Sequence, residues 1–352
     1  MSTTYRVTVE PLGREVPCRN DQPILDACLR AGVWLPHACT HGTCGTCKAE
    51  ILDGDVDHCD SSSFALMDFE RDEGKALICS ACPRSDVVIE GEVDEEEGIT
   101  TYPVADYTGV VTRIDDCATD TRRLTLDLDR DLAFNPGQYI TLAVPGCTET
   151  RTYSLANPPN EPRRLELHVR RTPGGLASDG WIFSSLAEGE GIKLSGPYGR
   201  FFLRPTRPEP MVLIAGGTGL APIKSIITHA LATDPDQQLT LYQGARTADM
   251  LYDVDYFSDL VTAHPDRFTY RPCLSEDDLP GYATGNVTDV LDADLPTCAG
   301  HVAYVCGPPP MVEAALKTLM HKRLFPRDIY REDFYDASDK AGGGVRSPLL
   351  KR

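Results

Sequence analysis

The chain has 352 residues, of which 41% are hydrophobic and 25% charged, a composition typical of a folded protein with two or three domains. Its net charge of −19 argues against nucleic-acid binding, because neutralising phosphates requires clustered Lys and Arg side chains. No apolar run approaches the roughly 18–20 residues that span a bilayer, and the N-terminus shows no secretory signal pattern, so we expect a cytoplasmic protein without a membrane segment.

The negative charge is concentrated near the N-terminus. Residues 1–100 contain 20 acidic and 8 basic side chains, which gives a net charge of −12 for that part alone. Such a surface would steer a positively charged protein partner towards the N-terminal part. The alternative is that the acidic residues serve only solubility.

Two breaks in composition divide the chain. The acidic stretch 94–98 leads to Pro103, and residues 204–210 contain three prolines, which exclude regular structure. We therefore expect domains at residues 1–98, 103–205 and 206–336, followed by a C-terminal tail at residues 337–352.

The first segment is predicted to mix strands and short helices. Its hydrophobic pattern predicts strands at Tyr5–Leu12, Glu15–Cys18 and Lys48–Leu52, and helices at Ile24–Ala31 and Phe64–Glu73.

Seven of the 13 cysteines lie between Cys28 and Cys82, which points to metal or redox chemistry rather than to disulfides. Cys39, Cys44 and Cys47 have the spacing C-x4-C-x2-C of plant-type ferredoxins, and 31 residues separate Cys47 from Cys79. Glycines between them would let the backbone turn its amides towards cluster sulfurs. We interpret the four thiolates as ligands of a 2Fe–2S cluster.

Two alternatives for this cysteine group stay open. A zinc site would pair Cys44 and Cys47 with Cys79 and Cys82, but it would leave Cys39 without a role. The fourth cluster ligand is interpreted as Cys79, with Cys82 as its rival and Cys59 as a weaker candidate.

The second segment is predicted to form an antiparallel barrel. Alternating runs at Leu124–Leu128, Tyr139–Val144 and Leu165–Val169 are separated by turn residues. The motif Arg151-Thr152-Tyr153-Ser154 offers an arginine for a pyrophosphate, a ring to stack on a flavin, and a hydroxyl for its reactive nitrogen.

A glycine-containing turn follows in the same segment. Residues 174–178 (Gly-Gly-Leu-Ala-Ser) precede a predicted helix and would leave amides free for phosphate oxygens. His168 and Arg170 are further candidates for cofactor contact, and the alternative for both is a solvent-facing strand.

The third segment is predicted to be a doubly wound α/β domain. The apolar run Met211–Ala215 indicates a buried parallel strand, and the glycines of residues 216–219 lie between it and a helix at Ile223–Ala230. A dinucleotide pyrophosphate binds at such a turn. The run Val302–Met311 predicts a second strand that would place Cys306 at the same edge of the sheet, unless Cys306 is only a core residue.

Together these motifs resemble the ferredoxin–NADP reductase superfamily with a plant-type ferredoxin fused at the N-terminus. The closer resemblance is to reductase components of multicomponent phenol hydroxylases and related soluble diiron monooxygenases. It rests on residues 64–68, 195–199, 306–311 and 323–330. The implied fold is a β-grasp (α+β) ferredoxin domain, an antiparallel β-barrel FAD domain and an α/β doubly wound NAD(P) domain.

The resemblance also implies a route for electrons from NAD(P)H through FAD and the 2Fe–2S cluster to a partner. Ser154, Cys306 and Glu332 would be the catalytic residues beside the flavin. Cofactor contacts would come from Arg151, Thr152, Tyr153, Ser154, His168, Arg170, Gly175, Leu176, Ala177, Ser178, Gly217, Thr218, Gly219, Arg246, Cys306, Gly307 and Phe334. About 18 residues follow Phe334, so this aromatic is not terminal as in the family.

The implied partner is the oxygenase component of a diiron monooxygenase, docking on the acidic ferredoxin domain. One alternative is the reductase of a ring-hydroxylating dioxygenase, and another, of a different class, is a non-enzymatic ferredoxin-like or zinc-binding interaction module. NADH is favoured over NADPH, because Asp249 would repel a 2′-phosphate that Arg246 would attract. A monomer that docks transiently is expected.

Overall fold

The computed structural model describes residues 3–37, 40, 42, 45–91 and 98–334 of the chain. These residues form two compact units. The first runs to Ala105 and also takes in Gly196–Arg200, and the second comprises Asp106–Ser195 and the chain from Phe201 onwards. Among the described helices, none has the length and apolar character needed to cross a membrane.

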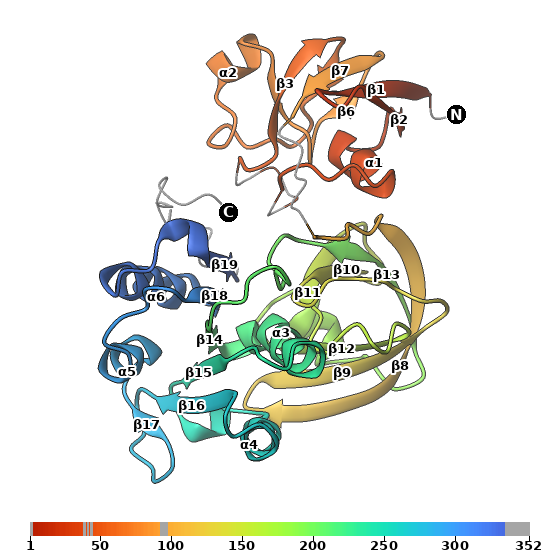
Figure 1. Ribbon diagram of the computed structural model, residues 1–352. Coiled ribbons are helices and arrows are strands. Elements are labelled where there is room, and N and C mark those ends of the chain that lie inside the picture. Colours follow the sequence, from red (N-terminus) through yellow and green to blue (C-terminus); the bar gives the residue numbers. More distant parts are fainter. Residues whose placement is uncertain (1–2, 38–39, 41, 43–44, 92–97, 335–352) are drawn as a thin grey trace. The chain divides into compact units, whose positions relative to one another are not determined.

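The first unit is built on a five-stranded mixed sheet in the order β2-β1-β7-β3-β5 (Figure 1). Strands β1 and β2 form an antiparallel hairpin, and β1 also pairs in parallel with β7. Helix α1 buries its apolar face, including Ile24, Cys28 and Leu29, because these residues recur at helical spacing. The elements are β1 Thr4–Glu10, β2 Arg14–Arg19, α1 Ile24–Arg30, β3 Lys48–Asp53, β4 Val56–Asp57, α2 Asp68–Asp72, β5 Lys75–Leu77, β6 Cys82–Pro83 and β7 Val87–Glu90.

The helix predicted at Phe64–Glu73 is shorter in the structure. Residues 62–66 form a turn in which the amides of Ala65 and Leu66 both donate to the carbonyl of Ser62. Met67 has an extended backbone, and its amide donates a hydrogen bond to the carboxylate of Glu70, so helix α2 begins only at Asp68. This hydrogen bond caps the helix at Met67, three residues before Glu70, so the first helical residue is Asp68.

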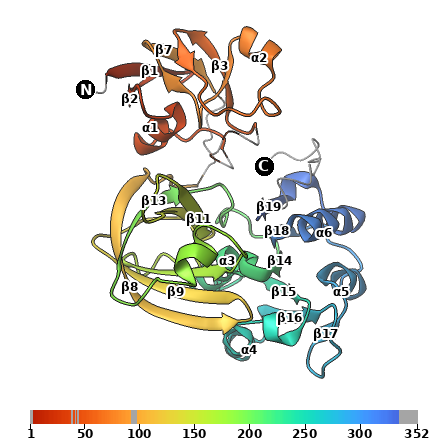
Figure 2. The same ribbon diagram turned by 180° about the vertical axis from the view of Figure 1, so that it is seen from behind.

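The second unit begins with a six-stranded antiparallel sheet in the order β11-β10-β13-β8-β9-β12. A bridge between Leu155 and Leu167 brings its two edge strands together, so the sheet closes into a barrel around the long curved strand β8 (Figure 2). The elements are β8 Ala105–Ala118, β9 Thr121–Leu128, β10 Tyr139–Ala143, β11 Thr150–Ser154, β12 Arg164–Arg170, the π-helical turn Ser178–Ile182 and β13 Gly191–Tyr198.

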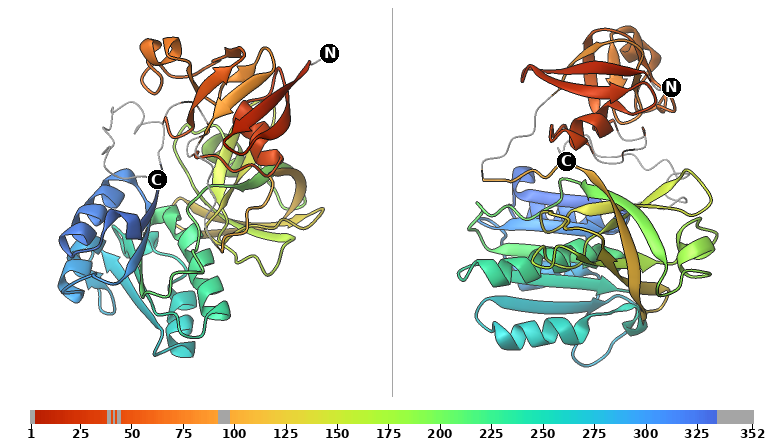
Figure 3. Two further views of the ribbon diagram at one scale, coloured as in Figure 1. Left: turned by 45° about the horizontal axis from the view of Figure 1, so that its top comes forward. Right: turned by 90° about the vertical axis from the view of Figure 1, so that its right-hand side faces the viewer.

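The rest of the second unit is a six-stranded parallel sheet in the order β17-β16-β15-β14-β18-β19. Helices α3 and α4 pack on one face, and α5 and α6 on the other (Figure 3). All six residues of β14 are buried, as a continuous apolar run predicts for a central parallel strand. The elements are β14 Met211–Gly216, the 3₁₀ turn Gly217–Gly219, α3 Leu220–Thr233, β15 Leu239–Ala245, the 3₁₀ turn Ala248–Met250, α4 Val254–Ala263, β16 Phe268–Leu274, β17 Ala283–Thr284, α5 Val287–Asp294, β18 Val302–Gly307, α6 Pro309–His321, the 3₁₀ turn Pro326–Asp328 and β19 Ile329–Asp333.

These three architectures confirm the predicted fold class. The strand order of the parallel sheet reverses between β14 and β18, since the chain adds β15 and β16 on one side and β18 and β19 on the other. Ligands of doubly wound sheets bind at the carboxyl ends of the strands at such a reversal. The turns that follow β14 and β18 lie at this reversal.

Candidate functional site

Two glycine turns meet backbone to backbone where the strand order reverses. A Cβ atom on Gly219 would lie 2.5 Å from the carbonyl carbon of Cys306 and 2.7 Å from the amide nitrogen of Gly307. A Cβ atom on Gly307 would approach the carbonyl oxygen of Gly216 to 3.0 Å, and Gly307 also has a φ of +154°. Only glycine permits this approach, so the packing explains why both turns carry it.

The turn at Gly217–Gly219 presents unpaired amides to any ligand at this edge. It leads directly into α3, and neither the turn nor the helix has a side-chain cap among the described residues. The first amides of a helix have no intrahelical acceptor, and together with the helix dipole they favour an anion. Gly217, Thr218 and Gly219 could therefore hold a phosphate, and we call this turn the phosphate cradle.

Two exposed arginines flank this cradle. A guanidinium nitrogen of Arg170 lies 4.0 Å from the position of a Cβ on Gly217. Arg170 forms no ion pair with any side chain in the described ranges, and the same holds for Arg246 just after β15. The carboxylate of Asp249, which would repel a 2′-phosphate if it faced the ribose, accepts hydrogen bonds from the hydroxyls of Thr119 and Thr247.

Ser154, Cys306 and Glu332 converge from three strands of the second unit. Cys306 and Glu332 are register partners in the parallel pair β18 and β19. Ser154 ends β11 of the barrel, and its side chain forms a hydrogen bond with the carboxyl of Glu332. The barrel and the parallel sheet therefore contribute jointly to one polar group at the carboxyl edge.

The members of this group are uncharged at neutral pH. Burial, with a smaller effect from Asp333, raises the pKa of Glu332 to about 8. Burial also raises the pKa of the Cys306 thiol well above its ordinary value, and the neighbouring Glu332 adds to this. Glu332 is partly exposed as a whole residue, whereas its Oε2 atom is buried and has no hydrogen-bond partner among the described residues. Such an atom requires a polar partner, and a flavin ring edge would supply one.

The barrel offers a matching set of groups for the rest of a flavin nucleotide. On β11, strand alternation places Arg151 and Tyr153 on one face and Thr152 on the other. The Arg151 side chain is 40% exposed and pairs with Glu149, so it is accessible to a phosphate. Burial raises the pKa of Tyr153 to about 12, which keeps its ring neutral.

A second phosphate cradle precedes the π-helical turn of the barrel. The amides of Leu176 and Ala177 donate to no acceptor in the part of the chain that is described. The turn before them is fixed internally, because the amide of Gly175 donates to the carbonyl of Thr172 and the Ser178 hydroxyl accepts from the Thr172 amide. These open amides fit a pyrophosphate.

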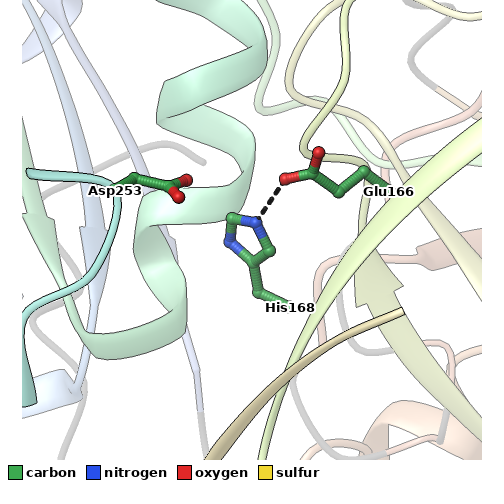
Figure 4. A group of neighbouring side chains, drawn as sticks. All are labelled: Glu166, His168 and Asp253. Carbon is green, nitrogen blue, oxygen red and sulfur yellow. Dashed lines mark hydrogen bonds and ion pairs between the residues drawn. The ribbon is translucent and has the colours of Figure 1, made fainter. Parts of the chain in front are cut away.

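His168 is placed differently from the other cofactor candidates. It is 3% exposed, and its Nε2 atom lies 2.7 Å from Glu166 Oε1 (Figure 4). Its Nδ1 atom lies 3.1 Å from the hydroxyl of Tyr252, so both ring nitrogens are engaged by protein groups. Asp253 and Lys224 complete this buried cluster, whose members come from β12, α3 and the start of α4.

Phe334 and Gly307 are joined through the backbone. The amide of Phe334 donates to the carbonyl of Gly307 at 3.0 Å, and the aromatic ring packs against the core on the α3 face of the sheet. Phe334 therefore lies at the carboxyl edge of the sheet, as Glu332 does.

Of the four predicted cluster ligands, Cys39 and Cys44 lie outside the described residues. Cys47 and Cys79 are buried, and the amide of Gly42 donates to Cys79 Sγ at 3.3 Å. Gly42 has a φ of +69° and Gly45 a φ of +75°, which is the left-handed backbone that turns amides towards a cluster. This geometry fits a 2Fe–2S cluster.

The rival ligand Cys82 is engaged elsewhere. Its thiol interacts with that of Cys59, and burial, followed by Cys59, raises its pKa to about 12. The arrangement favours Cys79, the residue that receives the Gly42 amide.

Sequence reasoning named His168 but not Glu166, Lys224 or Asp253 beside it. A signal for it exists in residues 164–170 (RLELHVR), where Leu165, Leu167 and Val169 are fully buried and the alternate residues are polar. Lys224, inside an otherwise apolar helix, is a second signal. Both indicate a polar face that must meet another polar surface.

Comparison with known proteins is consistent with this arrangement. Residues 7–84 match the family described as 2Fe-2S iron-sulfur cluster binding domain, residues 108–203 the oxidoreductase FAD-binding domain, and residues 213–317 the oxidoreductase NAD-binding domain. These matches confirm the predicted cofactors FAD, NAD and a 2Fe–2S cluster.

Related proteins match along nearly the whole chain. The chain is 46% identical to the phenol 2-monooxygenase reductase component DmpP of Pseudomonas sp. (strain CF600), with 99% of each chain covered. It is 45% identical to the aromatic O-demethylase reductase subunit of Amycolatopsis sp. (strain ATCC 39116 / 75iv2), covering 95% of this chain and 100% of that one. The crystal structure of the Amycolatopsis cytochrome P450 reductase GcoB aligns with a TM-score of 0.88 at 45% identity, covering 94% of this chain and 99% of that one.

Proposed function

Because the chain belongs to the family of monooxygenase reductase components, an NAD(P)H-dependent group of flavin and iron–sulfur oxidoreductases, we propose that it supplies electrons from NADH to a phenol hydroxylase of the diiron type. The observation that carries the proposal is the convergence of Ser154, Cys306 and Glu332 at the carboxyl edge of the nucleotide-binding sheet. When bound, FAD accepts a hydride and passes electrons singly to the 2Fe–2S cluster.

The residues of the chain would divide the work as follows. Gly217, Thr218 and Gly219 hold the pyrophosphate of the nicotinamide nucleotide through their amides, and Arg170 and Arg246 neutralise its charge. Cys306 and Gly307 form the wall against which the nicotinamide lies. The backbone packing of Gly219 on Cys306 keeps the phosphate cradle and this wall at a fixed separation.

On the flavin side, Arg151 and the amides of residues 175–178 would hold the FAD phosphates, with Thr152 and Tyr153 along its length. Ser154 and Glu332 face the reacting end. Since Glu332 keeps its proton up to a pH of about 8, its carboxyl can donate a hydrogen bond and hold a proton beside the flavin at neutral pH. Phe334 follows Glu332 and would close the same end.

Electrons would leave through a cluster bound by Cys39, Cys44, Cys47 and Cys79. The partner is proposed to dock on the ferredoxin domain, whose net charge of −12 over residues 1–100 would attract a basic surface. Raising the ionic strength should then slow reduction of the oxygenase while leaving reduction of a small acceptor by NADH unchanged.

A second candidate partner is a cytochrome P450. The alignment with the Amycolatopsis cytochrome P450 reductase, at a TM-score of 0.88, favours it specifically. Reconstitution with a diiron hydroxylase and with a cytochrome P450, at equal concentrations and ionic strength, distinguishes the two partners by the ratio of their turnover rates.

Three further points belong to the proposal. We take the domain boundaries as residues 1–98, 103–205 and 206–336, with a tail at residues 337–352. NADH is the proposed donor, which a comparison of kcat/KM for NADH and NADPH tests. The cytoplasm is the proposed location, because reduced pyridine nucleotides and free thiols are maintained there.

The central test is the visible spectrum of anaerobically purified protein before and after addition of NADH, with iron and flavin quantified. The proposal expects one flavin and about two irons per chain, both reduced by NADH. Flavin without iron, or reduction of the flavin alone, would contradict the assigned electron path.

A further inference from the structure

The barrel and the nucleotide-binding sheet are joined by a buried charged cluster. Lys224 Nζ on α3 lies 2.8 Å from Glu166 Oε1 on β12 and 2.8 Å from Asp253 Oδ2. Arg123 on β9 pairs with both carboxylates, so two positive and two negative charges balance. Glu166, His168 and Asp253 have the spacing of a cation site, but Lys224 and Arg123 already supply the positive charge there.

One hydrogen-bond chain runs from this cluster to the phosphate cradle. Glu166 contacts His168 Nε2, His168 Nδ1 lies 3.1 Å from the Tyr252 hydroxyl, and that hydroxyl lies 3.2 Å from the carbonyl oxygen of Gly217. Tyr252 is 4% exposed, so water does not compete for its hydroxyl. The chain therefore joins a strand of the FAD barrel to the first residue of the turn that precedes α3.

The Tyr252 hydroxyl has one proton and two acceptors within reach. When His168 is neutral, its Nε2–H donates to Glu166, and its Nδ1 atom accepts the Tyr252 proton. When His168 carries a second proton, Nδ1–H donates to the Tyr252 oxygen, and the Tyr252 proton can be donated to the Gly217 carbonyl. The link to the cradle is complete only in the second state.

We propose that Tyr252 is a positioning residue for the nicotinamide nucleotide, holding the Gly217 carbonyl in register with the FAD barrel in a manner governed by the proton on His168. Gly217 has a φ of +55°, and its carbonyl accepts the Leu220 amide within the turn, so the Tyr252 hydroxyl is a second donor that further restricts rotation about that peptide. The amides of Thr218 and Gly219 follow this peptide, so their direction depends on it. The inference rests on the proposed role of this turn in binding NADH.

Titration of His168 is set by the groups that face it. Burial lowers the pKa of His168 below its ordinary 6.5, opposed by the hydrogen bond that His168 donates to Glu166. The ionisable groups that surround it are Glu166 on its own strand, Arg123 on β9, Cys117 on β8, Lys224 on α3, and Tyr252 and Asp253 before α4. His168 is therefore neutral at pH 8 and gains its proton on the acidic side of 6.5.

The test measures KM for NADH and kcat with an artificial electron acceptor between pH 5.5 and 8.5, using the flavin-loaded full chain. In the wild type, KM should fall towards acidic pH. Tyr252→Phe removes only the hydroxyl, and at the acidic end of the range it should raise KM by up to about fivefold, the value of one net hydrogen bond, with kcat at saturation unchanged. At pH 8.5 the two KM values should be similar.

Tyr256→Phe is the matched control. The Tyr256 hydroxyl shares a hydrogen bond of 2.6 Å with Thr228 Oγ1 within the nucleotide-binding domain, and among the described residues it forms no hydrogen bond with the cradle. This variant should keep the wild-type KM at every pH. Equal changes in Tyr252→Phe and Tyr256→Phe, or a KM change that is the same at pH 5.5 and 8.5, would overturn the inference.

Arg170→Met separates this inference from the proposed function. It removes a charge beside Gly217 and should raise KM for NADH if the turn binds the nucleotide. An effect of Arg170→Met without one of Tyr252→Phe would overturn the Tyr252 link alone. No effect of either variant would overturn the assignment of the cradle, and with it this inference.

Discussion

Replacement of Glu332 by Gln tests the buried carboxyl at the centre of the site. Glu332 lies beside Cys306 in the register of β18 and β19, and its Oε2 atom is buried with no hydrogen-bond partner among the described residues. Gln has nearly the same shape and cannot ionise. The variant should therefore keep the fold and abolish the pH dependence that the carboxyl creates.

The magnitude follows from the pKa. Glu332 has a pKa of about 8 in the folded chain and an ordinary value of 4.5, a difference of roughly 3.5 pH units. Each pH unit corresponds to about 1.4 kcal/mol, so ionising this carboxyl in the folded state costs roughly 5 kcal/mol. Between pH 4.5 and 8 the folded chain retains a proton that the unfolded chain has released. The free energy of unfolding therefore falls by up to about 1.4 kcal/mol per pH unit in this window and levels off above 8.

Urea unfolding of the flavin-free protein from pH 5 to 9 measures this effect. The unfolding midpoints of wild type and Glu332→Gln should be close at pH 5, and the variant should become progressively the more stable up to pH 8. Glu313→Gln is the control, because it removes an exposed carboxylate of α6. Parallel profiles for wild type and Glu332→Gln would refute the assignment of a protonated carboxyl.

Three further predictions concern the charged cluster that joins the barrel to the nucleotide-binding sheet, the phosphate cradle at Gly217–Gly219, and the ligands of the iron–sulfur cluster. Lys224→Met leaves the carboxylates of Glu166 and Asp253 facing Arg123 alone, so it should destabilise the second unit by about 3–5 kcal/mol. Lys317→Met breaks an exposed ion pair and should cost under about 0.5 kcal/mol. Thermal unfolding of the two variants compares these costs. Gly219→Ala places a methyl 2.7 Å from the Gly307 amide nitrogen and should raise KM for NADH at least tenfold without loss of iron, and an unchanged KM would contradict the close packing of the two turns. Cys79→Ser should lose the iron and the cluster absorption while Cys82→Ser retains both, and the opposite result in iron analysis would make Cys82 the ligand.

The fold was predictable because its signals are local. The buried run at Met211–Ala215, the alternation in Leu165–Val169 and the cysteine spacing each depend on neighbours within one element. Helix α2 shows the limit of this reasoning. The apolar residues 64–67 continue a helical pattern, yet the capping hydrogen bond of Glu70 to the Met67 amide starts the helix only at Asp68.

The site was predictable as a set of residues but not as a geometry. Sequence spacing cannot show that Cys306 and Glu332, on strands separated by a helix and a turn, become register partners. It also left His168 between a cofactor contact and an exposed strand position. The structure excludes the exposed position, because docking of α3 and the start of α4 against β12 buries His168 within an ion-paired cluster. That outcome depends on packing between domains, which no local pattern encodes.

Two polar groups lie between the barrel and the nucleotide-binding sheet. The cluster around Lys224 is charged and the group around Cys306 is neutral, and this difference has a physical reason. Hydride transfer requires the reacting atoms to be held about 3–3.5 Å apart, so the two layers must not slide. Opposite charges at Lys224, Glu166, Asp253 and Arg123 hold the barrel and the nucleotide-binding sheet together, and they do so without net charge. Beside Cys306, an ionised thiol or carboxyl would oppose the arrival of negative charge during electron transfer, and there Ser154, Cys306 and Glu332 are neutral. The charged cluster therefore makes the interface rigid, and the neutral group beside Cys306 does not oppose electron transfer.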